Sequence, residues 1–140
     1  SSQQFSTVGR FGGITVKVLK LKDLNDNLSI SALRFEYDYS SKYSTDTKIA
    51  TLDNDEVEGL VKSIKNLQSN VFTSTRETYT EVTFTSRNDF QAGAYFSTDK
   101  QNWVSYIKLS KYDSNSIVFI QQKDLETLLG IIEIAKLKMK

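Results

Sequence analysis

Three lysines lie in or directly after one predicted strand, the segment "ITVKVLKL" at residues 14–21: Lys17, Lys20 and Lys22. A row of ammonium groups along a strand is typical of surfaces that follow nucleic-acid phosphates. The apolar alternation changes parity between Val18 and Leu19, which predicts a β-bulge that keeps all three lysines on the outer face. The next predicted strand carries Glu36 and Asp38, so neutralisation across the strands is the competing interpretation.

Tyrosines form the second group of candidate ligand-binding residues. The chain has seven tyrosines, eight phenylalanines and one tryptophan. A tyrosine ring exposed on a sheet can stack on a nucleic-acid base or a sugar ring. The alternative is that these rings border the core with their hydroxyl groups in water. The candidates are Tyr39, Tyr43, Tyr106 and Tyr112.

Carboxylate pairs are the third group, because two carboxyl groups at a suitable separation can hydrolyse a glycoside. Glu36 with Asp38 and Glu77 with Glu81 are such pairs, but lysine and arginine flank them, so exposed ion pairing explains both. The chain has no histidine and no cysteine, which removes the commonest general base and the thiolate nucleophile. The sequence predicts a protein that is not an enzyme, with no catalytic residues and no cofactor.

The segment "LDNDEVEGL" has the acidic character of a calcium loop. An EF-hand loop needs oxygen ligands at alternate positions and a glycine at the sixth. Val57 and Glu58 occupy the positions of the third ligand and the glycine. Asp53 followed by Glu56 three residues later is instead typical of a helix capping box. No metal site is predicted.

Length and charge limit the class of protein. The chain has 140 residues, with 18 basic and 17 acidic side chains, so we expect a single domain without strong nonspecific attraction to polyanions. No apolar run reaches the roughly 18 residues of a transmembrane helix. The chain begins with "SSQQFS" and lacks an initiator methionine, which favours a removed leader and an exported, periplasmic location over trimming of the chain.

The tripeptide "SKY" occurs twice, at Ser41 and Ser110. A shift of 68 residues places Leu60 on Leu128 and Ile64 on Ile132, and one residue of slack places Tyr43 on Tyr112. The same slack places Tyr37 on Tyr106. This repetition predicts one domain made of two related halves, at about residues 4–68 and 77–138.

Each half is predicted to contain four strands and a helix. Period-two alternation marks the strands, as in "SALRFEYDYS", and an apolar stripe of period 3.6 marks the first helix. The strands are expected at residues 5–9, 14–21, 31–40, 47–52, 79–86, 89–97, 102–110 and 116–120, and the helices at 53–67 and 122–140. The predicted fold is α+β, with antiparallel sheets and helices packed across them in the order β4-α-β4-α.

The second helix has apolar residues around most of its circumference. A helix on the surface of one sheet needs only one apolar stripe. It therefore lies between the two sheets, or it buries a second face against another copy in a homodimer. The candidate interface residues are Leu128, Ile131, Ile134 and Leu137.

The element order, together with the unit "SIVFIQQKDLETLLGII", resembles PUR-repeat and Whirly proteins. Those proteins bind single-stranded nucleic acid on their sheets, as dimers or larger assemblies, so the resemblance implies the same fold and partner. The segments "LDNDEVEGLVKSI", "ETYTEVTFTSRNDFQAGAYFS" and "DLETLLGIIEIAK" are similar to an uncharacterised bacterial family of often exported proteins. That family implies no activity.

Three functional hypotheses follow from the sequence. The first is a non-enzymatic binding or structural domain that forms dimers, and the second is a single-stranded nucleic-acid-binding protein. The third is a glycan-binding module of the envelope or the extracellular space. A nucleic-acid-binding sheet should present clustered lysines and unpaired aromatic rings, and a glycan site should present an aromatic cleft flanked by amides and carboxylates. A purely structural domain should bury the same tyrosines or satisfy their hydroxyl groups with partners.

Overall fold

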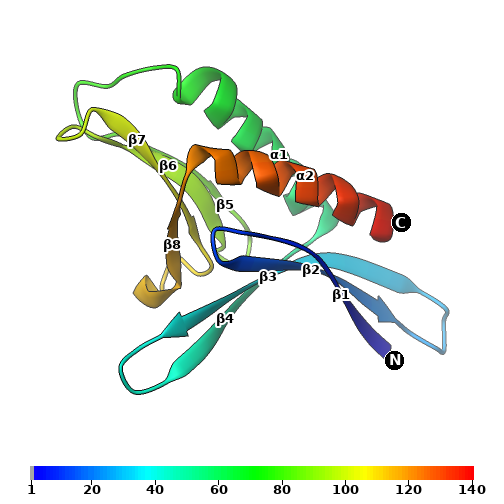
Figure 1. The fold of residues 1–140 in the computed structure, drawn as a ribbon. Coiled ribbons are helices and arrows are strands. Elements are labelled where there is room, and N and C mark those ends of the chain that lie inside the picture. Colours follow the sequence, from blue (N-terminus) through cyan, green and yellow to red (C-terminus); the bar gives the residue numbers. More distant parts are fainter. Residues whose placement is uncertain (1) are drawn as a thin grey trace.

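A computed structural model describes residues 2–140 as two four-stranded antiparallel sheets, each followed by a helix (Figure 1). The first half comprises β1 (Ser2–Phe11), β2 (Ile14–Lys22), β3 (Ser29–Ser40), β4 (Thr45–Leu52), α1 (Asn54–Asn66) and the π-helical turn η1 (Leu67–Val71). The second comprises β5 (Glu81–Thr85), β6 (Gln91–Ser97), β7 (Asn102–Lys108), the 3-10 turn η2 (Ser114–Ser116), β8 (Ile117–Ile120) and α2 (Gln122–Lys138). The predicted α+β class and the β4-α-β4-α order are confirmed.

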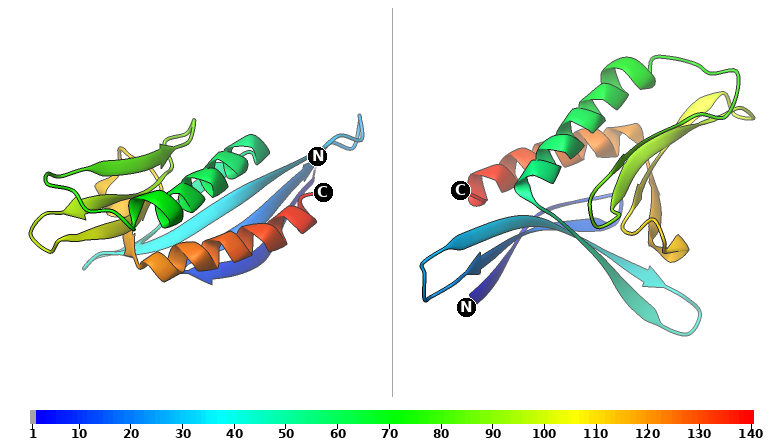
Figure 2. Two further views of the ribbon diagram at one scale, coloured as in Figure 1. Left: turned by 90° about the horizontal axis from the view of Figure 1, so that it is seen from above. Right: turned by 180° about the vertical axis from the view of Figure 1, so that it is seen from behind.

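The helices α1 and α2 lie side by side, with the first sheet beneath them and the second sheet at one end (Figures 1 and 2). α2 packs mainly on β1 and β2, whereas α1 contacts β3, β5 and β6. The side chains between these layers form one continuous core. Phe35 of β3 stacks on Phe90, which directly precedes β6, with ring centroids 4.7 Å apart. This contact joins the two sheets.

The predicted bulge in β2 is wrong. β2 pairs with β3 without interruption from Thr15 to Lys22, and the irregularity lies in β1, between Thr7 and Gly9. The apolar parity changes because the core ends near Val18, which is 1% exposed. Beyond that point α2 no longer covers the strand fully, so apolar side chains can lie on either face.

The repeated halves agree closely in their helices. Leu60 of α1 and Leu128 of α2 are fully buried, and so is Ile64, while its counterpart Ile132 is 1% exposed. In both helices a carboxylate in the first turn accepts a hydrogen bond from the N-cap backbone, at 3.1 Å for Glu56 and 2.8 Å for Asp124. The repetition therefore extends from the apolar positions to the caps.

The equivalence of Tyr37 and Tyr106 is wrong. Tyr37 has the same strand parity as Phe35 and packs against the core. Tyr106 has the opposite parity from its core-facing neighbours on β7, so its ring lies on the other side of its sheet. A shift of one residue along a strand moves a side chain to the other face of the sheet. The one-residue slack allowed in aligning the two halves introduced that shift.

The structure also corrects the candidate interface on α2. Leu128 is fully buried and Ile131 is 7% exposed, because both side chains belong to the chain's own core. Ile134 and Leu137 are 50% and 71% exposed. The apolar circumference of α2 therefore arises largely because the helix packs on β1, β2 and α1. Within residues 2–140, neither helix combines the length and apolar character needed to cross a bilayer.

A candidate aromatic binding groove

The outer face of the second sheet, defined as the face turned away from the core, carries the candidate site. Strand alternation explains its composition. On β6, Ala92 and Ala94 point into the core, so Gln91, Gly93 and Tyr95 lie on the outer face. The neighbouring strands β7 and β8 add further aromatic, apolar and charged side chains to the same face.

These side chains border a groove of about 290 Å³. The groove is lined by Tyr79, Glu81, Gln91, Tyr95, Tyr106, Lys108, Ile117 and Phe119. Tyr79 lies two residues before the start of β5, and the other residues come from all four strands of the sheet. Its aromatic rings, together with one carboxylate, one amide and one ammonium group, give it both apolar and polar walls.

Tyr106 forms the floor of the groove and is only 4% exposed. Its hydroxyl group donates to Glu81 Oε2 at 2.6 Å and lies 2.6 Å from Thr83 Oγ1. To reach β5 from β7, the ring passes over β6 at Gly93, the residue paired with both Tyr106 and Thr83. The absence of a side chain at Gly93 makes room for this ring.

Two aromatic rings remain accessible at the borders of the groove. Tyr79 is 62% exposed and Phe119 is 59% exposed. The ring of Tyr79 stacks on Tyr95 with centroids 5.7 Å apart and an interplanar angle of 29°. Tyr95 in turn contacts Tyr106, with centroids 6.5 Å apart. These contacts fix the orientation of the exposed Tyr79 ring before any ligand binds.

Burial and Glu81 together determine the electrostatics of the groove. Burial raises the pKa of Tyr106 above its ordinary value, and the hydrogen bond to Glu81 raises it further. The pKa of Tyr79 is also raised, first by burial and then by the charge of Glu81. Both phenols stay neutral at physiological pH and act as donors. Glu81 keeps an oxygen that Tyr106 does not use, so it can accept a hydrogen bond from a ligand.

The seven predicted ligand-binding residues do not gather in one place. Lys17 lies on the outer face of the first sheet and forms an ion pair with Glu36 at 2.9 Å. The strand parity places Lys20 and Lys22 on the opposite face, the one that carries α2. The predicted neutralisation across the strands is therefore confirmed for Lys17, and the three lysines do not form a single stripe.

The four predicted tyrosines are equally dispersed. Tyr39 lies beneath the ammonium group of Lys48, at 6.0 Å, near the end of β3. Tyr43 and Tyr112 are 88% and 79% exposed in the turns that precede β4 and β8. Only Tyr106 belongs to the groove. The sequence contained one signal for the remaining site, since a glycine inside a strand, here Gly93, marks the close approach of another group.

The acidic cap of α1 has a structural role. Arg87 donates to Asp53 Oδ2 and to Asp55 Oδ2, each at 2.8 Å. The hydrogen bond from Arg87 holds the pKa of Asp55 below its usual value. Across residues 2–140 no group of three or more acidic, histidine or cysteine side chains is arranged to hold a metal ion.

Comparison with known proteins found no matching family model, no matching curated protein and no matching solved structure. The resemblances to PUR-repeat and Whirly proteins and to the bacterial family therefore stay predictions from the sequence. The features that bear on function are the geometry of the groove and the distribution of charge around it.

Proposed function

We propose that this chain is a non-enzymatic binding domain that holds a saccharide in the aromatic groove of the second sheet. The observation that carries the proposal is that the accessible rings of Tyr79 and Phe119 line the same groove as Glu81 and Gln91. A sugar ring has an apolar C–H face and a rim of hydroxyl groups. The aromatic rings suit the face, and the carboxylate and amide suit the rim.

The polar groups of the groove have the arrangement expected for a neutral ligand. Glu81 and Lys108 bring opposite charges to the same groove, so its net charge is close to zero. The amide nitrogen of Gln91 donates to Thr85 Oγ1 at 3.2 Å, which leaves the amide oxygen as an acceptor for a sugar hydroxyl. Convergent polar groups of this kind orient a ligand in an otherwise apolar site.

Single-stranded nucleic acid is the less favoured ligand. A protein that follows a phosphate backbone uses several unpaired lysine or arginine side chains along one path. The groove contains Lys108 alone among basic residues, beside Glu81. Lys17 is already paired with Glu36 on the other sheet. Lys17, Lys20 and Lys22 are thus on a different sheet from the aromatic groove.

The test is a titration of the full chain with neutral, acidic and amino oligosaccharides, followed by calorimetry and amide chemical shifts. We expect saturable binding that shifts the amides of β5 to β8. The Tyr79→Ala variant should weaken it by about 5- to 150-fold, since one stacked ring contributes roughly 1–3 kcal/mol. The Tyr112→Ala variant removes a similarly exposed ring outside the groove and should leave affinity unchanged.

Two outcomes would overturn the proposal. One is equal loss of affinity in the Tyr79→Ala and Tyr112→Ala variants, which would show that the groove is not the site. The other is the absence of oligosaccharide binding while single-stranded DNA shifts the groove amides. That result would make the nucleic-acid hypothesis the better one.

A further inference from the structure

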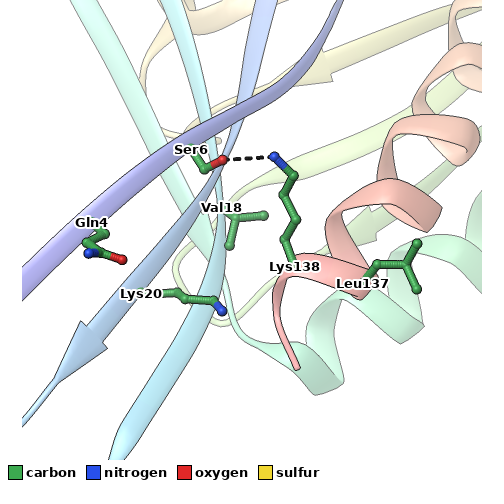
Figure 3. Close-up of a pocket in the computed structure, with 6 residues that line it drawn as sticks. All are labelled: Gln4, Ser6, Val18, Lys20, Leu137 and Lys138. Atoms are coloured by element: carbon green, nitrogen blue, oxygen red, sulfur yellow. Dashed lines mark hydrogen bonds between the residues drawn. The ribbon is translucent and has the colours of Figure 1, made fainter.

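A second cleft lies on the first sheet, on the face that carries α2, and it is separate from the aromatic groove. It opens between β1, β2 and the C-terminal end of α2, with a volume of about 340 Å³ (Figure 3). Its walls are formed by Gln4, Ser6, Val18, Lys20, Leu137 and Lys138. Figure 3 shows Lys20 on the strand side and Lys138 on the helix side of the same opening.

Three elements bring hydrogen-bond donors to this cleft. Gln4 of β1 is paired with Lys20 of β2, so both side chains lie on the same face of the sheet. Ser6 lies two residues further along β1 and accepts a hydrogen bond from Lys138 Nζ at 3.1 Å. That contact fixes the ammonium group of Lys138 over the strands and leaves the hydroxyl hydrogen of Ser6 free to donate.

Among the residues that the structure describes, neither cleft lysine forms an ion pair with an aspartate or glutamate side chain. Lys20 Nζ has only the backbone oxygen of Lys140, at 3.5 Å, and Lys138 has Ser6. Within residues 2–140, six other basic residues form ion pairs: Lys17, Arg34, Lys48, Arg87, Lys111 and Lys136. Twelve of the 18 basic residues form no ion pair within residues 2–140, and two of these twelve, Lys20 and Lys138, face this cleft.

The helix dipole explains only part of this arrangement. A lysine in the last turn of a helix interacts favourably with the negative end of the dipole, which accounts for Lys138. It does not account for Lys20, which comes from a strand and faces the same opening. The two ammonium groups together make the opening positive, which favours an anionic ligand.

We infer that this cleft binds a phosphate monoester. A phosphate group carries about −1.5 to −2 charges at pH 7 and three acceptor oxygens. Those properties match two ammonium groups plus the donors of Ser6 and Gln4, whereas a carboxylate offers one charge and two oxygens. Leu137, which is 71% exposed, provides an apolar wall for the organic part of the ligand.

The experiment is a titration of the full chain with inorganic phosphate and with a small aryl phosphate, followed by calorimetry and amide shifts. We expect shifts confined to β1, β2 and the end of α2, and tighter binding of the aryl phosphate because of Leu137. The Lys20→Gln and Lys138→Gln variants should each weaken binding by about tenfold, the effect of one charge-assisted hydrogen bond. Urea unfolding of each variant would establish that it is folded.

Lys123→Gln is the matched control. Lys123 is exposed in the first turn of α2, at the other end of the same helix, so its substitution changes the net charge equally. An equal loss of affinity in Lys123→Gln would overturn the inference, because binding would then depend on net charge alone. Acetate binding as tight as phosphate binding would also overturn it. So would single-stranded RNA that shifts the same amides and binds with higher affinity than the aryl phosphate.

Discussion

Glu56 and Arg87 join the start of α1 to the turn between β5 and β6. Glu56 Oε2 accepts a hydrogen bond from the backbone N–H of Arg87 at 2.7 Å, and Glu56 Oε1 accepts one from the backbone N–H of Asp53 at 3.1 Å. The side chain of Glu56 is only 6% exposed. A single buried carboxylate therefore caps the helix of the first half and holds the first hairpin of the second half.

We expect the Glu56→Ala variant to lose about 2 kcal/mol of unfolding free energy, because it leaves two backbone N–H groups without their acceptor. Urea unfolding would measure the loss. The matched control is Glu126→Ala, which removes an exposed carboxylate from α2 and should change stability by less than about 0.5 kcal/mol. Equal losses in the two variants would contradict the role assigned to Glu56.

Gly93 and Gly130 should respond to alanine substitution in opposite directions. A Cβ atom at Gly93 would lie 2.3 Å from the carbonyl oxygen of Val82 and 2.9 Å from the Cα atom of Thr83, both backbone atoms. A Cβ atom at Gly130 would meet nothing within 4 Å. We expect Gly93→Ala to destabilise the fold by about 1–3 kcal/mol and to displace the Tyr106 ring.

The Gly130→Ala variant should instead gain about 0.5–1 kcal/mol, because alanine in a helix interior loses less conformational entropy than glycine. Urea midpoints of the two variants, with near-ultraviolet circular dichroism to follow the tyrosines, would test both expectations. Gly93→Ala at or above wild-type stability would contradict the close approach of the β5 backbone to Gly93.

Tyr106 should make stability depend on pH in the alkaline range. Burial and the hydrogen bond to Glu81 raise its pKa in the folded state, whereas an unfolded tyrosine ionises near pH 10. The contribution of the Tyr106 hydroxyl group to the free energy of unfolding is therefore fully present below about pH 10. It is lost as the pH rises above that value. The difference in urea midpoint between wild type and Tyr106→Phe should shrink above about pH 10.

The comparison variant for this prediction is Tyr43→Phe. Tyr43 is 88% exposed, so its hydroxyl makes no buried hydrogen bond to lose. The variant should keep the wild-type midpoint across the same pH range. A Tyr106→Phe midpoint that differs from wild type by a constant amount at every pH would show that the hydroxyl does not ionise differently in the folded state.

The strands and helices could be predicted from the sequence because each has a clear period. β3 alternates from Leu33 to Tyr39, and the apolar stripe of α1 corresponds closely to its buried residues. The match between Leu60 and Leu128 allowed the two halves to be predicted, because helices with equivalent packing keep the same spacing of apolar residues. Local patterns of this kind depend on which face is buried and not on contacts between distant segments.

The groove could not be predicted because its parts meet only through the sheet register. Tyr79 and Tyr95 are separated by a turn and most of two strands, and their stacking follows from the pairing of β5 with β6. The prediction that Lys17, Lys20 and Lys22 share one face was wrong for a related reason. A change of apolar parity accompanies either a bulge or the end of the core, and only the packing of α2 shows that the core ends near Val18.

Leu128 and Leu137 distinguish the two roles that the sequence allowed for α2. Leu128 is fully buried within the chain and Leu137 is 71% exposed. We expect Leu128→Ala to cost about 2–5 kcal/mol of unfolding free energy and Leu137→Ala to change it by less than about 0.5 kcal/mol. If Leu137 were instead buried against a second copy, Leu137→Ala would lower the midpoint in a way that depends on protein concentration. Urea unfolding at two protein concentrations separates these cases, and a concentration-dependent loss would return the exposed end of α2 to the role of a subunit interface.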